Sequence, residues 1–239
     1  MKTIEATALV IAKAPVAGFA KTRLSPPFSA TEAAQLAAAS LLDTLAAVRR
    51  SGTRHRFVAW TGDLERAERA SELATELADF TLIRQCGNSF GHRLARAHRD
   101  AAEPGLPVLQ IGMDTPQAGP ALLAHAATRL LECGDAVLGP ATDGGWWALG
   151  LTDPTAARTL TEVPMSTGST GERTRIALRA RGCRVQDLPT LSDVDTAADA
   201  RTVAGECRGH FSSLLAQFCA PDSAAERAVI TTGDAARHG

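Results

Sequence analysis

Short apolar runs alternate along the chain with longer segments in which apolar residues recur every three or four positions. The runs predict buried strands, and the longer segments predict amphipathic helices. The predicted strands cover residues 7–12, 56–61, 81–84, 108–111, 136–138 and 184–188, with one more strand after Gly145. Because strands and helices alternate, the pattern predicts an α/β fold with a mostly parallel sheet.

The predicted helices have recognisable starts and ends. Ser29 and Glu32 form a capping box, and Gly52 ends the helix that follows. Ser169 and Glu172 repeat this pattern, and Thr196 and Asp199 form another cap pair. The other helices are predicted at 64–78, before residue 102, at 116–133 and at 210–219.

The stretch 108–116 lies at the centre of this plan. Its apolar run ends at Gly112, and Thr115-Pro116 has the form of an N-cap followed by a first helical residue. Asp114 is therefore expected at the carboxyl end of a central strand, where open α/β sheets bind ligands. The alternative is that Asp114 only complements the dipole of the helix that starts here.

The loop 13–24 follows the first strand and carries Lys13, Lys21 and Arg23. It contains neither GxGxxG nor a Walker A motif, so the sequence does not support a dinucleotide fold or a P-loop. Backbone amides with Lys and Arg side chains still suit phosphate groups, and long loops in compact domains are often functional. The alternative is a solvated loop with ordinary surface charges.

Three further places carry candidate chemistry. Arg93 lies in the first turn of a helix, where the dipole disfavours a cation unless an anion lies opposite.

Asp143-Gly144-Gly145 permits a tight turn beside Trp146 and Trp147, of which only one can face a pocket. The alternative there is a plain β-turn with two core tryptophans. Asp193 and Asp195 either start a helix, or one of them turns inward to a metal that Asp114 also binds.

Composition narrows the function classes. The chain has 239 residues, 45% of them hydrophobic, and a formal net charge of −1, so nothing indicates nucleic acid or an anionic membrane as a partner. We find no membrane-span or signal-peptide pattern and expect a cytoplasmic protein. The five cysteines lack zinc-site spacing and are expected to be reduced.

Residues 1–208 are expected to form a single domain, and residues 209–239 a short helix with a mobile tail.

Four motifs together resemble a known family. They are Ala12-Lys13-Ala14-Pro15-x-x-Gly18-x-x-Lys21-Thr22-Arg23-Leu24, Ile111-Gly112-x-Asp114-x-Pro116, Gly139-Pro140-Ala141-x-Asp143-Gly144-Gly145 and Asp193-Val194-Asp195-Thr196. In this order, over about residues 6–205, they resemble the DUF2064 family. Those proteins are similar to GT-A glycosyltransferases, the nucleotide-diphospho-sugar transferase superfamily, and to phospholactate and molybdenum-cofactor guanylyltransferases.

The chain departs from the family pattern at uncharged positions. Met113 replaces a usual Ser, Thr115 a usual Cys and Ala17 a common Pro, and Trp146-Trp147 replaces a pair that is often Tyr-Tyr. Every charged motif residue is present, so the resemblance still implies phosphate and metal chemistry. The acceptor or sugar preference is expected to differ.

The resemblance implies a three-layer α/β/α sandwich with a mixed, mostly parallel sheet. It implies nucleotide binding by the loop 12–23, with Mg²⁺ or Mn²⁺ held by Asp114 and Asp195. The residues assigned to the nucleotide are Ala12, Ala14, Gly18, Lys21, Arg23 and Arg93; those assigned to the sugar or acceptor are Asp143, Gly144, Gly145 and Trp147. Catalysis is assigned to Lys21, Arg23 and Asp143.

Three functions remain open at this point. The first is glycosyl transfer from a nucleotide sugar to a small-molecule acceptor. The second is guanylyltransferase-like nucleotidyl transfer from an NTP, which releases pyrophosphate. The third is a nucleotide-binding module without turnover, and it ranks last because no charged site residue is missing.

Overall fold

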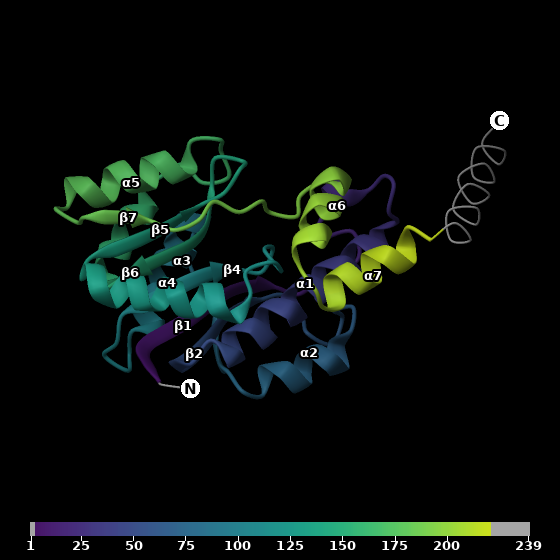
Figure 1. Cartoon of the computed structure of the whole chain (residues 1–239), viewed down its shortest axis with the longest axis horizontal. Coiled ribbons are helices and arrows are strands. Elements are labelled where there is room, and N and C mark those ends of the chain that lie inside the picture. The colour runs from purple at the N-terminus through teal and green to yellow at the C-terminus, as the bar shows by residue number, and fades with distance from the viewer. Residues whose placement is uncertain (1–2, 221–239) are drawn as a thin grey trace.

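The computed structural model describes residues 3–220 and contains one seven-stranded sheet (Figure 1). The strands are β1 (Ile4–Lys13), β2 (Thr53–Thr61), β3 (Thr81–Arg84), β4 (Val108–Gly112), β5 (Ala136–Pro140), β6 (Trp146–Leu151) and β7 (Val185–Asp187). Their spatial order is β3-β2-β1-β4-β6-β5-β7. In the described sheet only β6 runs antiparallel to its neighbours. β4 is the middle strand, as predicted.

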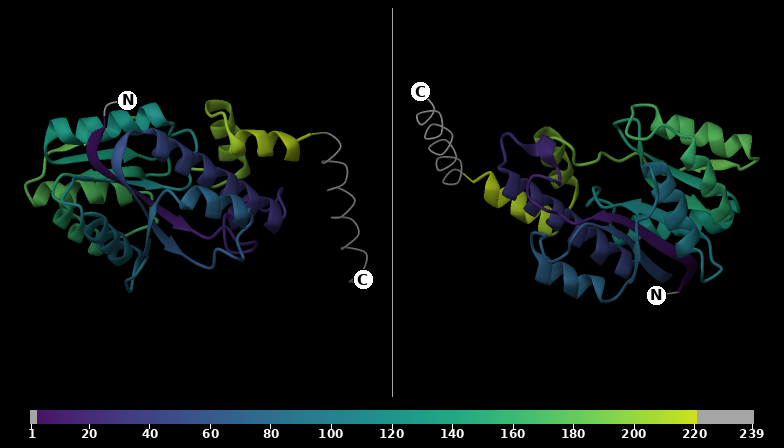
Figure 2. Two further views of the ribbon diagram at one scale, coloured as in Figure 1. Left: turned by 90° about the horizontal axis from the view of Figure 1, so that it is seen from below. Right: turned by 180° about the vertical axis from the view of Figure 1, so that it is seen from behind.

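Helices cover both faces of the sheet. They are α1 (Ala30–Arg50), α2 (Ala70–Leu77), α3 (Phe90–Ala101), α4 (Pro120–Cys133), α5 (Thr170–Ala180), α6 (Ala197–Glu206) and α7 (His210–Phe218), with 3-10 helices η1 (Thr22–Leu24) and η2 (Pro154–Thr161). α1, α2 and α4 pack on one face, and α3, η2 and α5 on the other (Figures 1 and 2). This confirms the predicted three-layer α/β/α sandwich.

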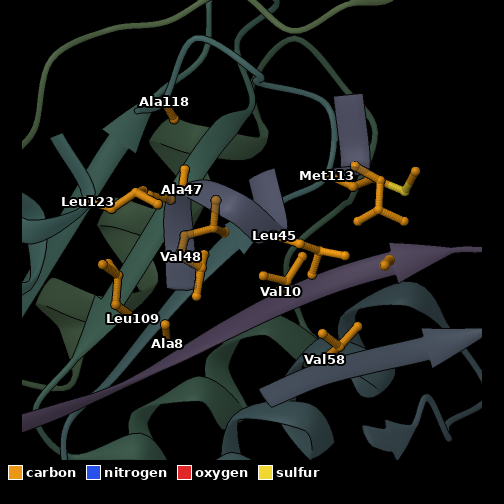
Figure 3. Packing of buried hydrophobic residues seen from close by; sticks show 14 of the residues in the cluster. Ala8, Val10, Leu45, Ala47, Val48, Val58, Leu109, Met113, Ala118 and Leu123 are labelled. Atoms are coloured by element: carbon orange, nitrogen blue, oxygen red, sulfur yellow. The ribbon is translucent and has the colours of Figure 1, made fainter. Parts of the chain in front are cut away.

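The largest core lies between the sheet and the layer formed by α1 and α4. Val10 and Leu109 from the strands meet Leu45, Val48 and Leu123 from the helices (Figure 3). All five side chains are buried. The apolar runs and the apolar residues that recur every three or four positions predicted this burial. This core therefore fixes the positions of the strands relative to α1 and α4.

A second core lies outside the sandwich. Leu24 and Phe28, in and after η1, pack with Leu36 of α1, Val203 of α6 and Phe211 of α7. Figure 1 shows α6 and α7 beside α1, away from β5, β7 and α5. The C-terminal helices therefore brace the loop that carries Lys21 and Arg23.

Two predicted helix starts and one predicted cap are wrong. α4 begins at Pro120 with Gly119 as N-cap, not at Thr115-Pro116, because the amide of Ala118 donates to the carbonyl of Thr115 and closes a turn there. α2 begins at Ala70, not near residue 64. The Ser169 side chain does not cap α5, because its Oγ accepts from Arg173 Nε while Glu172 pairs with Arg175.

Other predicted helix boundaries are confirmed. The Ser29–Glu32 and Thr196–Asp199 capping boxes form, and α4 ends at Cys133, followed by Gly134 in the left-handed conformation. The five cysteines are free, as expected. Within residues 3–220, no helix has the length and apolar character to cross a membrane. The predicted mobile tail from residue 221 lies outside the described residues.

Candidate active site

A cavity of about 730 Å³ opens at the carboxyl ends of β1, β2 and β4. Most residues that the sequence assigned to the site line this cavity. They are Ala12, Lys21, Arg23, Arg93, Asp114, Asp143, Gly145, Trp147 and Asp195. Segments more than 170 positions apart in the chain therefore meet in one place, as at Lys21 and Asp195.

Lys21 is the electrostatic centre of the cavity. Its Nζ lies 2.9 Å from Asp114 Oδ2 and 3.0 Å from Asp195 Oδ1, and its side chain is only 10% exposed. Arg23 Nη1 lies 3.5 Å from the other Asp195 oxygen but is 78% exposed. Lys21 thus joins the two carboxylates, whereas Arg23 keeps most of its guanidinium group open to the cavity.

Backbone hydrogen bonds hold the late carboxylates beside Asp114. After β7, the amide of Leu191 donates to Pro140 and the amide of Val194 donates to Asp114. This segment therefore crosses from the end of β5 to the end of β4 and carries Asp193 and Asp195 with it. Since α4 begins only at Pro120, Asp114 does not complement a helix N-terminus, and that alternative is excluded.

The pKa values of the charged groups reflect this crowding. Burial alone would lower the pKa of Lys21, but Asp114 and Asp195 outweigh it, so the pKa is raised and the ammonium stays charged. Burial, with the nearby charges of Asp114 and Asp143, raises the pKa of Asp193 to about 7. Burial and the neighbouring carboxylates therefore disfavour the charged form of Asp193.

Asp193 is the site residue that the sequence left undecided. It lines the cavity, and its Oδ1 is buried without a hydrogen-bond partner. Asp114 Oδ1 is also buried and unpartnered. The Asp-x-Asp spacing singled out the pair, but only the path of the segment after β7 shows that both members reach the cavity.

The hairpin between β5 and β6 positions Asp143. Its Oδ1 accepts a hydrogen bond of 2.7 Å from the amide of Gly145. Gly144 has a positive φ of 86°, and a Cβ there would lie 2.0 Å from the carbonyl oxygen of Gly168. Gly144 therefore shapes the turn and lies outside the cavity lining, while Asp143 and Gly145 face it.

The two tryptophans are not equivalent. Trp147 is 1% exposed and donates from Nε1 to the carbonyl of Pro189, so its ring is packed in the core. Trp146 is half-buried and lines the cavity. Of the two, Trp146 is placed to offer a ring to a ligand, although the sequence assigned that place to Trp147.

Ala14 and Gly18 do not line the cavity. Ala14 is buried, and its Cβ lies where a side chain at Gly62 would have to go. Gly18 has a positive φ of 78° in the turn before Phe19. Both residues shape the loop 13–24 from outside its ligand-facing surface.

The carboxylates fit a hard divalent ion in part. No group of three or more His, Cys, Asp or Glu side chains within residues 3–220 is arranged to hold a metal by itself. Mg²⁺, however, is usually bound through one or two carboxylates together with substrate phosphates. The unpartnered buried oxygen of Asp114 is the donor that such an arrangement needs.

Comparison with protein-family models identifies the family of this chain. A family model described as "Uncharacterized protein conserved in bacteria (DUF2064)" matches residues 44–167. The chain belongs to the DUF2064 family. No curated protein matches it. The matched range of this DUF2064 protein includes Asp114 and Asp143, whereas Lys21 and Asp195 lie outside it.

Solved structures share the fold. One is a Desulfovibrio desulfuricans G20 protein proposed to be a nucleotide-diphospho-sugar transferase, with 24% identity, TM-score 0.79 and coverage of 91% of this chain and 96% of that chain. Another is a cytidylyltransferase from Leptospira borgpetersenii serovar Hardjo-bovis, with 12% identity, TM-score 0.53 and coverage of 90% and 94%. At such identities the likeness establishes the fold alone.

Proposed function

We propose that this DUF2064 protein is a metal-dependent transferase that uses a nucleotide-activated donor, with glycosyl transfer from a nucleotide sugar as the first candidate. The observation that carries the proposal is the Lys21 ammonium between Asp114 and Asp195, with Arg23 beside it, in a cavity at the carboxyl ends of the strands. The fold shared with transferases of both kinds supports it.

The two cations suit the phosphates of the donor in different ways. An ammonium group can donate three hydrogen bonds. The Lys21 ammonium donates two of them to Asp114 and Asp195, so one N–H remains for a phosphate oxygen. The exposed Arg23 guanidinium can form a bidentate pair with phosphate. Together they would neutralise the charge that develops on the departing nucleoside diphosphate.

Asp114 and Asp195 would hold the divalent ion. When bound, Mg²⁺ or Mn²⁺ would supply positive charge to the phosphate oxygens of the donor. Asp143 would bind sugar hydroxyls or accept the acceptor proton, with Gly145 and Trp146 beside it. In this reaction the bond from the sugar carbon to the diphosphate oxygen breaks, and a bond to the acceptor oxygen forms.

Nucleotidyl transfer is the second candidate. There an acceptor phosphate oxygen would attack the α-phosphorus of an NTP, and pyrophosphate would leave, bound by Lys21 and Arg23. The shared fold of the cytidylyltransferase supports it. A nucleotide-binding module without turnover ranks third, because cations, carboxylates and cavity are all present.

The leaving group separates these functions. The protein is incubated with Mg²⁺ or Mn²⁺, small-molecule acceptors and each NTP or nucleotide sugar in turn, and the products are followed by chromatography. Release of nucleoside diphosphate supports glycosyl transfer, and release of pyrophosphate supports nucleotidyl transfer. Binding without release supports the module, and no binding of any nucleotide contradicts the proposal.

Asp114→Asn tests the metal assignment. We expect nucleotide binding in the presence of Mn²⁺ to fall steeply while the circular dichroism spectrum stays unchanged. Asp79→Asn is the matched control, since Asp79 is an exposed carboxylate that does not line the cavity. Unchanged Mn²⁺ affinity in Asp114→Asn would remove this residue from the metal site.

A further inference from the structure

Arg93 is a cation without a carboxylate partner in the part of the chain that the structure describes. Arg96 and Arg99 on the same helix both pair with Asp100. Arg93 instead lies half-buried in the cavity wall, and its Nε is buried without a hydrogen-bond partner. The protein itself therefore leaves the positive charge of Arg93 unneutralised.

This arrangement is unfavourable without a ligand. A cation in the first turn of α3 faces the positive end of the helix dipole. A buried donor without an acceptor adds the cost of its lost hydration. A partly compensating contact is made with the ring of Phe90, whose centroid lies 5.4 Å from the Arg93 guanidinium carbon. An anion in the cavity would offset both costs.

Arg93 belongs to a different wall from Lys21 and Arg23. α3 packs against η2, whereas the loop that carries Lys21 is braced by α6 and α7. α3 also packs against β1, β3 and β4, whereas α7 packs against α1 and α6. The cavity therefore presents a second cationic group, separate from the Lys21 cluster that suits the donor phosphates.

We propose that Arg93 binds an anionic group, phosphate or carboxylate, on the acceptor. This assignment replaces the nucleotide role that the sequence suggested for Arg93. The identity of the ligand as the acceptor rests on the proposed function, whereas the anion site itself does not. Phe90 is 38% exposed and also lines the cavity, so it offers an apolar surface next to this anion. The acceptor class is then a small anionic molecule, not a neutral sugar.

The Nε–Hε signal of Arg93 in a ¹H–¹⁵N spectrum tests this directly. We titrate inorganic phosphate, and separately acetate, into the protein saturated with a nucleoside diphosphate and Mg²⁺, and into the free protein. We expect the Arg93 signal to shift in both states, and the anion that binds more tightly identifies the acceptor group. In Arg93→Gln, phosphate affinity should fall at least tenfold, whereas Arg96→Gln, the matched control on the same helix, should leave it unchanged.

The outcomes separate this inference from the proposed function. A phosphate affinity equal in wild type and Arg93→Gln, or a signal that does not move, overturns the inference. A nucleoside diphosphate affinity that falls in Arg93→Gln, with no second anion bound, also overturns it, because Arg93 then belongs to the donor. If the protein binds no nucleotide but phosphate still shifts the Arg93 signal, the proposed function fails and the anion site stands.

Discussion

The two walls of the cavity hold their cations in opposite ways. Lys21 is neutralised by two carboxylates within 3.0 Å, and both come from segments distant in the chain. Among residues 3–220, the side chain of Arg93 has only the face of an aromatic ring from its own helix as a partner. Carboxylates of the protein hold the Lys21 ammonium in position before any ligand binds. The charge of Arg93, in contrast, would be neutralised only by a bound anion.

The supports of the two walls also differ. The Lys21 wall depends on the second core, in which Leu24 packs with helices from the end of the described chain. The Arg93 wall depends on α3, which packs against η2 and the sheet. Changes in one support should therefore affect one cation and spare the other.

Phe211→Ala should have the largest effect on stability. Phe211 is fully buried in the second core, so we expect the free energy of unfolding to fall by about 3–5 kcal/mol. Nucleoside diphosphate affinity should fall as well, because the loop bearing Lys21 loses its brace. Urea unfolding and calorimetric titration measure the two effects.

Phe57→Ala is the matched control for Phe211→Ala. Phe57 is buried with Ala97 and Ala101 of α3, on the other wall. We expect a similar loss of stability with nucleotide affinity retained. Equal losses of affinity in the two variants would show that the walls are not independent.

His98→Leu should change how stability depends on pH. Burial lowers the pKa of His98 from 6.5 to about 4. Between pH 6.5 and pH 4, His98 is therefore protonated in the unfolded chain and neutral in the folded chain. Relative to His98→Leu, the wild type should therefore lose about 3 kcal/mol of stability as pH falls from 6.5 to 4. Urea unfolding across this range should show that the variant lacks this loss, and parallel curves would contradict the burial of a neutral His98.

Lys21→Met should weaken nucleoside diphosphate binding about 100-fold, or about 3 kcal/mol. The variant loses a phosphate ligand and leaves two carboxylates unneutralised near the donor. Lys21→Arg should recover only part of the affinity, since a planar guanidinium does not replace an ammonium between two carboxylates. Phosphate binding at Arg93 should survive in both variants, and its loss would contradict the separation of the two cations.

Arg23→Gln should have the smallest effect on stability. The ion pair of Arg23 with Asp195 is 3.5 Å long and exposed, and such pairs contribute about 0–1 kcal/mol. We expect an unchanged unfolding midpoint in urea and a moderate loss of nucleotide affinity. A stability loss as large as that of Phe211→Ala would mean that Arg23 is structural.

Local patterns predicted the fold well. The capping box at Ser29 and the apolar runs involve residues close in sequence, so their interactions can be read from spacing. The start of α4 shows the limit of this reasoning. Thr115-Pro116 and Gly119-Pro120 both have the form of a helix start, and the turn closed between Thr115 and Ala118 selects the second.

Most of the site residues that the sequence predicted line the cavity, but their contacts were not predictable from the sequence. The motifs brought Lys21, Asp114 and Asp195 together correctly. They did not show that Lys21 is the group that joins the two carboxylates, because this depends on the hydrogen bond from Val194 to Asp114 across the sheet. Nor could alternation along β6 decide that Trp147 turns inward to donate to Pro189.

The link between Lys21 and Asp195 has a consequence for biosynthesis. The ribosome makes Lys21 early and its partner 174 residues later. Until α6 and α7 leave the exit tunnel, the loop bearing Lys21 lacks both its brace and one of its counter-charges. The pair of carboxylates beside Lys21 is therefore complete only when nearly all of the described chain has been translated.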